Sequence, residues 1–91
     1  MKTKYATAVY ENNGYMVVKY HKTEIVQFNS EEITLNSDGW YTATTKRRMN
    51  EVSETFNLGY HVFSKKSKWY VNFKDETIEF VDSMVLNTSV S

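Results

Sequence analysis

Residues 39–59 read GWYTATTKRRMNEVSETFNLG and contain the chain's one convincing helix. Met49, Val52 and Phe56 recur at the i, i+3 and i+7 spacing, which places three apolar side chains on one stripe of a helix. Asn57-Leu58-Gly59 then supplies a left-handed cap of the kind that commonly ends helices. We therefore expect an amphipathic helix that packs on the rest of the chain through this stripe.

The start of this helix carries three consecutive basic residues, Lys46, Arg47 and Arg48, directly after Thr44 and Thr45, either of which can act as the N-cap. The free N–H groups of a first turn favour acids, and a cation there costs about 0.3–1 kcal/mol. Free N–H groups, threonine hydroxyls and three cations would together bind an anion such as a phosphate. The helix start is therefore a candidate phosphate site.

The alternative interpretation of the helix start is a solvated basic face. Glu51 follows Arg47 at i+4, and Glu54 follows Asn50 at the same spacing, so local pairs would compensate part of the positive charge. Exposed pairs of this kind contribute only tenths of a kcal/mol. Both interpretations stay open at this point.

Short stretches of β-forming residues flank the helix on both sides, while residues 1–9 show only a weak pattern. The predicted fold class is α+β, a small antiparallel sheet in the order β-β-β-α-β-β, with Thr77–Val81 as a further strand and one helix packed on one face. Residues 84–86 form either a further strand or a helical turn. The expected strands are Tyr15–Tyr20, Glu24–Phe28, Glu32–Leu35, Tyr60–Phe63, Lys68–Phe73 and Thr77–Val81.

The length of 91 residues, the absence of proline and the lack of a linker indicate a single domain over residues 1–91. The chain has no cysteine, which excludes disulfides, thiolate metal sites and cysteine nucleophiles. Its acidic residues lie near turns without a spacing that singles out a catalytic pair, and its two histidines have no identifiable partner. We therefore expect a non-enzymatic protein with no catalytic residue, no metal and no cofactor.

A formal net charge of zero hides an uneven distribution of charge along the chain. Residues 40–74 carry seven basic residues against two acids, whereas the acidic segment 75–91 carries four acids and no base. Such a chain can present a field of one sign on one face. In the alternative, the acidic segment folds back and pairs with the basic middle.

A second basic cluster follows the helix, in the predicted hairpin loop around Lys65, Lys66 and Lys68. Tyr70 shares a strand face with Lys68, and lysines interleaved with exposed rings are typical of a surface that follows a phosphate backbone and stacks bases. Lysines are also common in hairpin loops, so a plain solvated loop stays open.

Both tryptophans are expected in the core. Trp69 alternates with Val71 and Phe73 along the predicted strand 68–73. Trp40, directly after Gly39, would close the end of the helix against the sheet.

Residues 39–71, GWYTATTKRRMNEVSETFNLGYHVFSKKSKWYV, resemble a small domain of unknown function from bacteriophage and other mobile-element proteins. The shared frame is Gly-Trp, a Thr-Thr-Lys-Arg-Arg-Met-Asn run, a Leu-Gly-aromatic step and an aromatic-rich strand. The resemblance covers most of residues 15–73 and leaves the first fourteen residues and the acidic segment outside. It implies a phage-type accessory protein and supplies no mechanism.

We therefore expect a small phage-type accessory protein that binds nucleic-acid backbone or another phosphate-bearing anion. The alternative is an anti-CRISPR-like inhibitor that blocks a host or defence factor by protein–protein contact, because Tyr, Trp and Arg dominate interface hot spots. DNA, RNA and a protein surface stay open as partners, and an edge strand would allow a homodimer. The candidate binding residues are Thr44, Thr45, Lys46, Arg47, Arg48, Lys65, Lys66, Lys68 and Tyr70.

The chain shows no apolar run long enough for a membrane helix and no secretory signal at its start. We therefore expect no membrane partner and a cytoplasmic location in the host cell.

Overall fold

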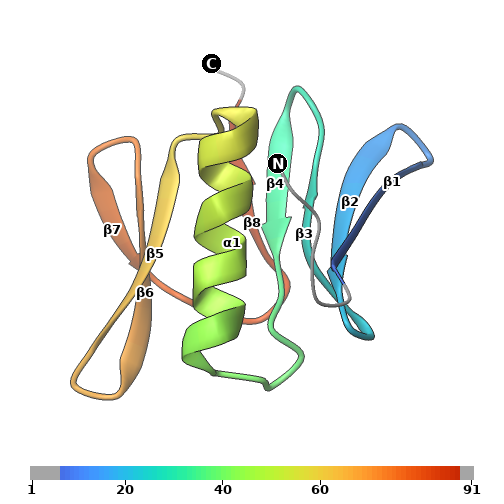
Figure 1. Cartoon of the computed structure of the whole chain (residues 1–91). Coiled ribbons are helices and arrows are strands. Elements are labelled where there is room, and N and C mark those ends of the chain that lie inside the picture. Colours follow the sequence, from blue (N-terminus) through green and yellow to red (C-terminus); the bar gives the residue numbers. More distant parts are fainter. Residues whose placement is uncertain (1–6, 89–91) are drawn as a thin grey trace.

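One helix and eight strands follow one another in the order β-β-β-β-α-β-β-β in the computed structural model, which describes residues 7–88 (Figure 1). Five strands form one antiparallel sheet in the order β1-β2-β3-β4-β8, and three form a second in the order β5-β6-β7. The elements are β1 Thr7–Asn12, β2 Tyr15–Tyr20, β3 Thr23–Phe28, β4 Glu32–Leu35, α1 Ala43–Phe56, β5 Tyr60–Lys65, β6 Lys68–Phe73, β7 Glu76–Glu79 and β8 Met84–Asn87.

The α+β class and the antiparallel strands around one helix are confirmed, and the strands divide between two sheets. Residues 84–87 form a strand, which pairs with β4 at the edge of the larger sheet. β1 lies in the weakly patterned first stretch and pairs with β2 across a two-residue turn at Asn13 and Gly14, whose φ values are +54° and +86°. Positive φ at both central residues is what such a tight hairpin requires.

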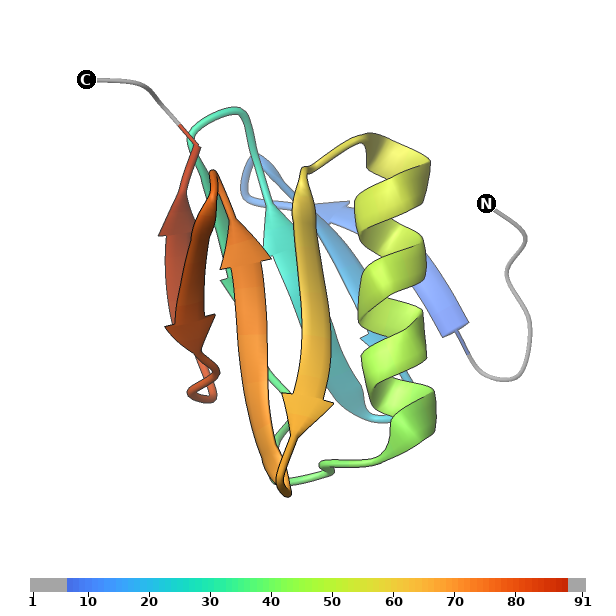
Figure 2. The ribbon, with the colours of Figure 1, turned by 90° about the vertical axis from the view of Figure 1, so that its left-hand side faces the viewer.

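The molecule has two layers (Figure 2). Helix α1 lies beside β5 and contacts β2 and β3, so the helix and the smaller sheet together face the five-stranded sheet. The core lies between these layers and contains Ile25 and Ile33 of the larger sheet, Met49 of the helix and Val71 of the smaller sheet, all fully buried. Burial of such side chains contributes roughly 1.5–3 kcal/mol each.

The helix begins two residues before the predicted start. Its N-cap is Thr42, not Thr44 or Thr45, because Thr42 has extended backbone angles and its Oγ1 accepts the Thr45 N–H at 3.1 Å. The C-cap is confirmed, since Asn57 adopts the left-handed conformation at φ 57° and ψ 50°. Lys46 is consequently the fourth helical residue and lies beyond the free N–H groups of the first turn.

Side chains of α1 occupy the free edge of β5. Asn50 Nδ2 donates to the Val62 carbonyl at 2.8 Å, and its Oδ1 accepts the Val62 N–H at 2.7 Å. One turn later Ser53 Oγ donates to the Tyr60 carbonyl at 2.6 Å and accepts the Tyr60 N–H at 3.1 Å. The helix thereby satisfies the outward backbone groups of an edge strand that would otherwise stay open.

Asp82, in the acidic segment, anchors the loop between β4 and α1. Its carboxylate accepts the Ser37 N–H at 2.8 Å, the Ser37 hydroxyl at 2.6 Å and the Gly39 N–H at 3.0 Å. Within residues 7–88 the ion pair closer than 4 Å is Arg48–Glu51, so the acidic segment does not form ion pairs with the basic middle there. This segment acts instead by fixing a loop.

Candidate functional site

The two basic clusters of the sequence meet at one end of the molecule, where the start of α1 lies next to the β5–β6 turn (Figures 1 and 2). Lys46 Nζ donates to Ser64 Oγ at 2.8 Å and lies 5.8 Å from the ring centroid of Trp69. Lys65 and Lys68 face each other across the hairpin. The fold therefore joins cations that are about twenty residues apart in sequence.

The outer face of the smaller sheet carries a row of stacked rings. The ring centroids of His61 and Phe63 are 6.3 Å apart at 15°, and those of Phe63 and Tyr70 are 5.7 Å apart at 29°. The alternating residues Tyr60 and Val62 point into the core, so this face is turned to solvent. Of these three rings the sequence predicted only Tyr70 as a stacking residue, although the alternation along β5 was a signal for His61 and Phe63.

Phe63 lies between two open hollows, of about 500 and 610 Å³. Lys65, Lys66 and Tyr70 line the first, together with Thr77. The second lies towards the helix. Its charged or titratable lining residues are Lys46, Arg47, Glu51, Glu54 and His61.

We call this surface the basic ring face and define it as His61, Phe63 and Tyr70 with Lys46, Arg47, Lys65, Lys66 and Lys68.

Acidic groups limit the positive field of the basic ring face. Glu51 and Glu54 line the helix-side hollow, and Glu79 of β7 lies opposite Tyr70 in the sheet register. A surface with this balance attracts an anionic ligand more weakly than a purely basic one does. The stacked rings are therefore the more distinctive feature of this face.

Three of the predicted residues lie outside this face or are already engaged. Thr45 is 3% exposed, and its hydroxyl accepts a hydrogen bond from Thr42 Oγ1 at 3.0 Å. Arg48 Nη1 lies 2.6 Å from Glu51 Oε1, and the Arg48 side chain is only 17% exposed. Glu51 therefore pairs with Arg48 and not with Arg47. Thr44 is exposed but lines a different hollow.

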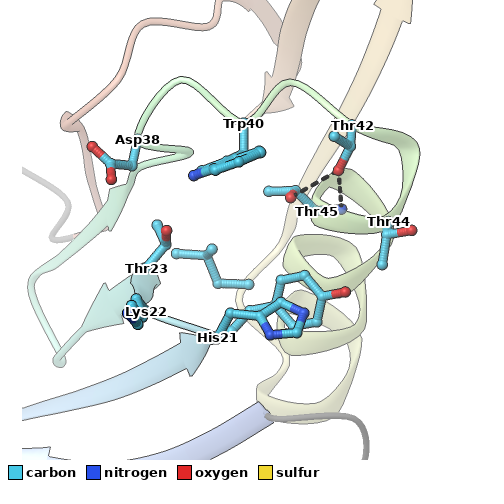
Figure 3. Close-up of a pocket in the computed structure, with 10 residues that line it drawn as sticks. His21, Lys22, Thr23, Asp38, Trp40, Thr42, Thr44 and Thr45 are labelled. Carbon is cyan, nitrogen blue, oxygen red and sulfur yellow. Dashed lines mark hydrogen bonds between the residues drawn. The ribbon is translucent and has the colours of Figure 1, made fainter.

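That third hollow, of about 850 Å³, lies between the β2–β3 turn and the loop before α1 (Figure 3). Trp40 borders it and is 63% exposed, so the expectation of a core position is wrong. The neighbouring Tyr41 is 52% exposed as well, although its ring packs edge-on against Trp69 and Phe80, with ring centroids 5.0 and 6.0 Å apart. Asp82 anchors the backbone of this loop at Ser37 and Gly39.

No three histidine or acidic side chains gather into a metal-binding group within residues 7–88. The helix in this part of the chain is fourteen residues long, and it is too short and too polar to cross a membrane.

The fold and the surface together define a small α+β domain with one face that is both basic and aromatic. The chain belongs to the Kyanoviridae Gp96 protein family of phages, whose family model matches residues 1–87. This match includes the first fourteen residues and most of the acidic segment, both of which the sequence resemblance left outside. Searches of curated proteins and of solved structures found no match.

Proposed function

We propose that this phage protein binds a single strand of nucleic acid on the basic ring face. The observation that carries the proposal is the row His61–Phe63–Tyr70 beside the hairpin lysines, in which His61 is exposed and the other two rings are half-buried. Successive rings on a sheet surface are suited to stacking unpaired bases, and flanking cations are suited to following the phosphates. A duplex keeps its base faces stacked inside and would use the cations alone.

Magnitudes favour stacking as the main source of affinity. A base stacked on an aromatic side chain contributes about 1–3 kcal/mol, whereas each phosphate contact adds a salt-dependent increment. The five cations of the basic ring face have Glu51, Glu54 and Glu79 as acidic neighbours, and the chain as a whole has zero net charge. We therefore expect moderate affinity, little sequence preference and a shallow dependence on salt.

The first experiment measures binding of labelled single-stranded DNA, single-stranded RNA and duplex DNA at low and at physiological salt by fluorescence anisotropy. Phe63→Ala and Tyr70→Ala should each weaken single-strand binding about tenfold. Lys65→Ala/Lys66→Ala should reduce the salt slope by about 1.4, the contribution of two phosphates on a single strand. Lys19→Ala removes a cation from the opposite sheet and should change neither quantity.

Phe63→Leu serves as a second ring variant, because it keeps apolar bulk on the sheet and removes only the flat face. A folded Phe63→Leu protein with wild-type affinity would contradict the stacking proposal. Absence of single-strand binding at low salt would reject the proposal, and absence of duplex binding as well would reject nucleic-acid binding altogether. In that outcome the alternative, inhibition of a host or defence protein by direct contact, becomes the leading hypothesis.

A further inference from the structure

The hollow beside Trp40 has the size and lining of a small-molecule site. Its volume of about 850 Å³ lies within the usual range for ligand pockets, roughly 300–1,000 Å³. Its lining includes the side chains of Ile25, Thr23 and Thr45, which are 0%, 8% and 3% exposed. Packed side chains of this kind give the hollow a preformed base.

Aromatic rings border this hollow on two sides. Trp40 lies on one side, and His21 lies on the other beside Tyr20, whose ring centroid is 4.3 Å from that of the histidine (Figure 3). A flat ring placed between them can stack on either wall. Offset or edge contacts between rings contribute about 0.5–1.5 kcal/mol beyond the buried area.

The loop that carries Trp40 is held in place without help from a ligand. The Trp40 N–H donates to the Ser37 carbonyl at 2.9 Å, and the Trp40 carbonyl accepts the Thr42 N–H at 2.8 Å. Asp82 fixes the same loop at Ser37 and Gly39. The backbone that carries the exposed indole is therefore preorganised, so little ordering entropy is lost from the loop when a ligand binds.

Polar groups at the rim offer both kinds of hydrogen bond. The Asp38 carboxylate can accept, while the Lys22 ammonium and the Trp40 indole N–H can donate. None of these three side chains makes a hydrogen bond or ion pair with another residue of the described part, 7–88. A ligand whose edge carries donors and acceptors would satisfy these groups.

We propose that this hollow binds a nucleobase, stacked against Trp40, with Asp38 and Lys22 of the rim as hydrogen-bonding partners for its edge. The Asp38 carboxylate is turned outward in Figure 3 and would rotate toward the ligand. A purely aliphatic ligand would leave the polar groups of the rim without hydrogen bonds to the ligand, and a bare phosphate would leave the apolar floor of the hollow uncovered. The hollow lies on the other side of α1 from the basic ring face, so this site does not depend on the proposed function. The nucleobase that it binds belongs either to a free nucleotide or to a nucleic-acid strand.

Intrinsic fluorescence tests the proposal directly, because the chain has two tryptophans and Trp69 is only 8% exposed. Titration with AMP, GMP, CMP, UMP and adenosine should quench the exposed Trp40 saturably, and ribose 5-phosphate should not. Calorimetry should show that Trp40→Ala raises the dissociation constant of the tightest-binding of these ligands about tenfold. Asp38→Asn should change the ranking of the bases, and Val81→Ala, at an exposed position outside the lining, should change nothing.

The same fluorescence titrations of the Lys65→Ala/Lys66→Ala variant show whether the nucleobase belongs to a free nucleotide or to a bound strand. Quenching by a mononucleotide that is unchanged in this variant would support a free nucleotide. Saturable Trp40-dependent quenching by an oligonucleotide alone, weakened in this variant, would support a base of a bound strand. The proposal is overturned if no nucleotide, nucleoside or oligonucleotide quenches saturably, if ribose 5-phosphate quenches equally, or if Trp40→Ala binds as the wild type does.

Discussion

The two sides of helix α1 are attached to the rest of the molecule in different ways. Towards β5 the attachment is polar: Asn50 and Ser53 each exchange two hydrogen bonds with the backbone of the strand. Towards β2 and β3 it is apolar. There Phe56 packs on Phe28 with ring centroids 5.0 Å apart, and the helix start borders an open hollow.

The difference teaches how one short helix can support two unlike surfaces. Directional bonds to β5 fix the helix against the smaller sheet, which keeps Lys46 and Arg47 next to the stacked rings. The apolar packing on the other side, through Met49, Val52 and Phe56, leaves an open hollow at the helix start. The first side holds a surface in place, and the second leaves room for a ligand.

Asn50→Ala should produce the largest effect, because it breaks the polar side of the helix. It leaves the Val62 N–H and carbonyl without partners at a half-buried edge, which should lower the free energy of unfolding by about 2 kcal/mol. Urea unfolding followed by circular dichroism measures this change. Thr55→Ala, at an exposed helix position, is the matched control and should stay within about 0.5 kcal/mol. Equal stabilities of the two variants would refute the polar attachment.

Tyr60→Phe should have a smaller effect, about 1 kcal/mol, since it removes one hydrogen bond from the tyrosine hydroxyl to the Met49 carbonyl. The effect should also depend on pH. Burial raises the pKa of Tyr60 well above its ordinary value of 10.0, so the folded protein keeps a proton that the unfolded chain loses above that pH. The wild type therefore loses stability from this group as pH rises past 10, and the variant does not.

The difference in stability between wild type and Tyr60→Phe should consequently shrink in alkaline solution. Tyr10 and Tyr15 also have raised pKa values, because they donate hydrogen bonds to Glu24 and Glu32, but both proteins share them. Unfolding in denaturant at neutral and alkaline pH measures the comparison. A difference that stays constant across pH 10 would contradict a buried, protonated Tyr60.

Trp40→Ala should have the smallest effect on stability, within about 0.5 kcal/mol, because the side chain is 63% exposed and lies on the open side of the helix. Thermal unfolding measures it. A loss of several kcal/mol would mean that the indole belongs to the core after all, as the sequence pattern predicted.

Local patterns in the sequence predicted the elements that depend on local spacing. The stripe Met49, Val52 and Phe56 and the cap at Asn57 were found because a helix repeats every 3.6 residues. The helix start was misplaced because Thr42, Thr44 and Thr45 are all suitable caps, and backbone angles decide among them.

Contacts between distant residues were harder to predict. Asn50 was expected beside Glu54 on the helix surface, but it binds Val62 of β5, which local spacing does not reveal. Trp40 was expected in the core but is exposed, on a loop that Asp82, more than forty residues away, anchors at Gly39. The row of rings could be predicted only with the pairing of β5 and β6, which places Phe63 and Tyr70 side by side on the same solvent-facing side of the hairpin.

The pairing of β8 with β4 has a consequence for the order in which the chain folds. The bonds between α1 and β5 join residues only 7 to 18 positions apart, whereas the bond between Thr88 and Ser30 spans 58 positions. Short loops close at lower entropic cost than long ones, so the helix and the smaller sheet should form first. During synthesis the larger sheet receives β8 only after residues 84–87 have been made, and β4 keeps an open edge until then.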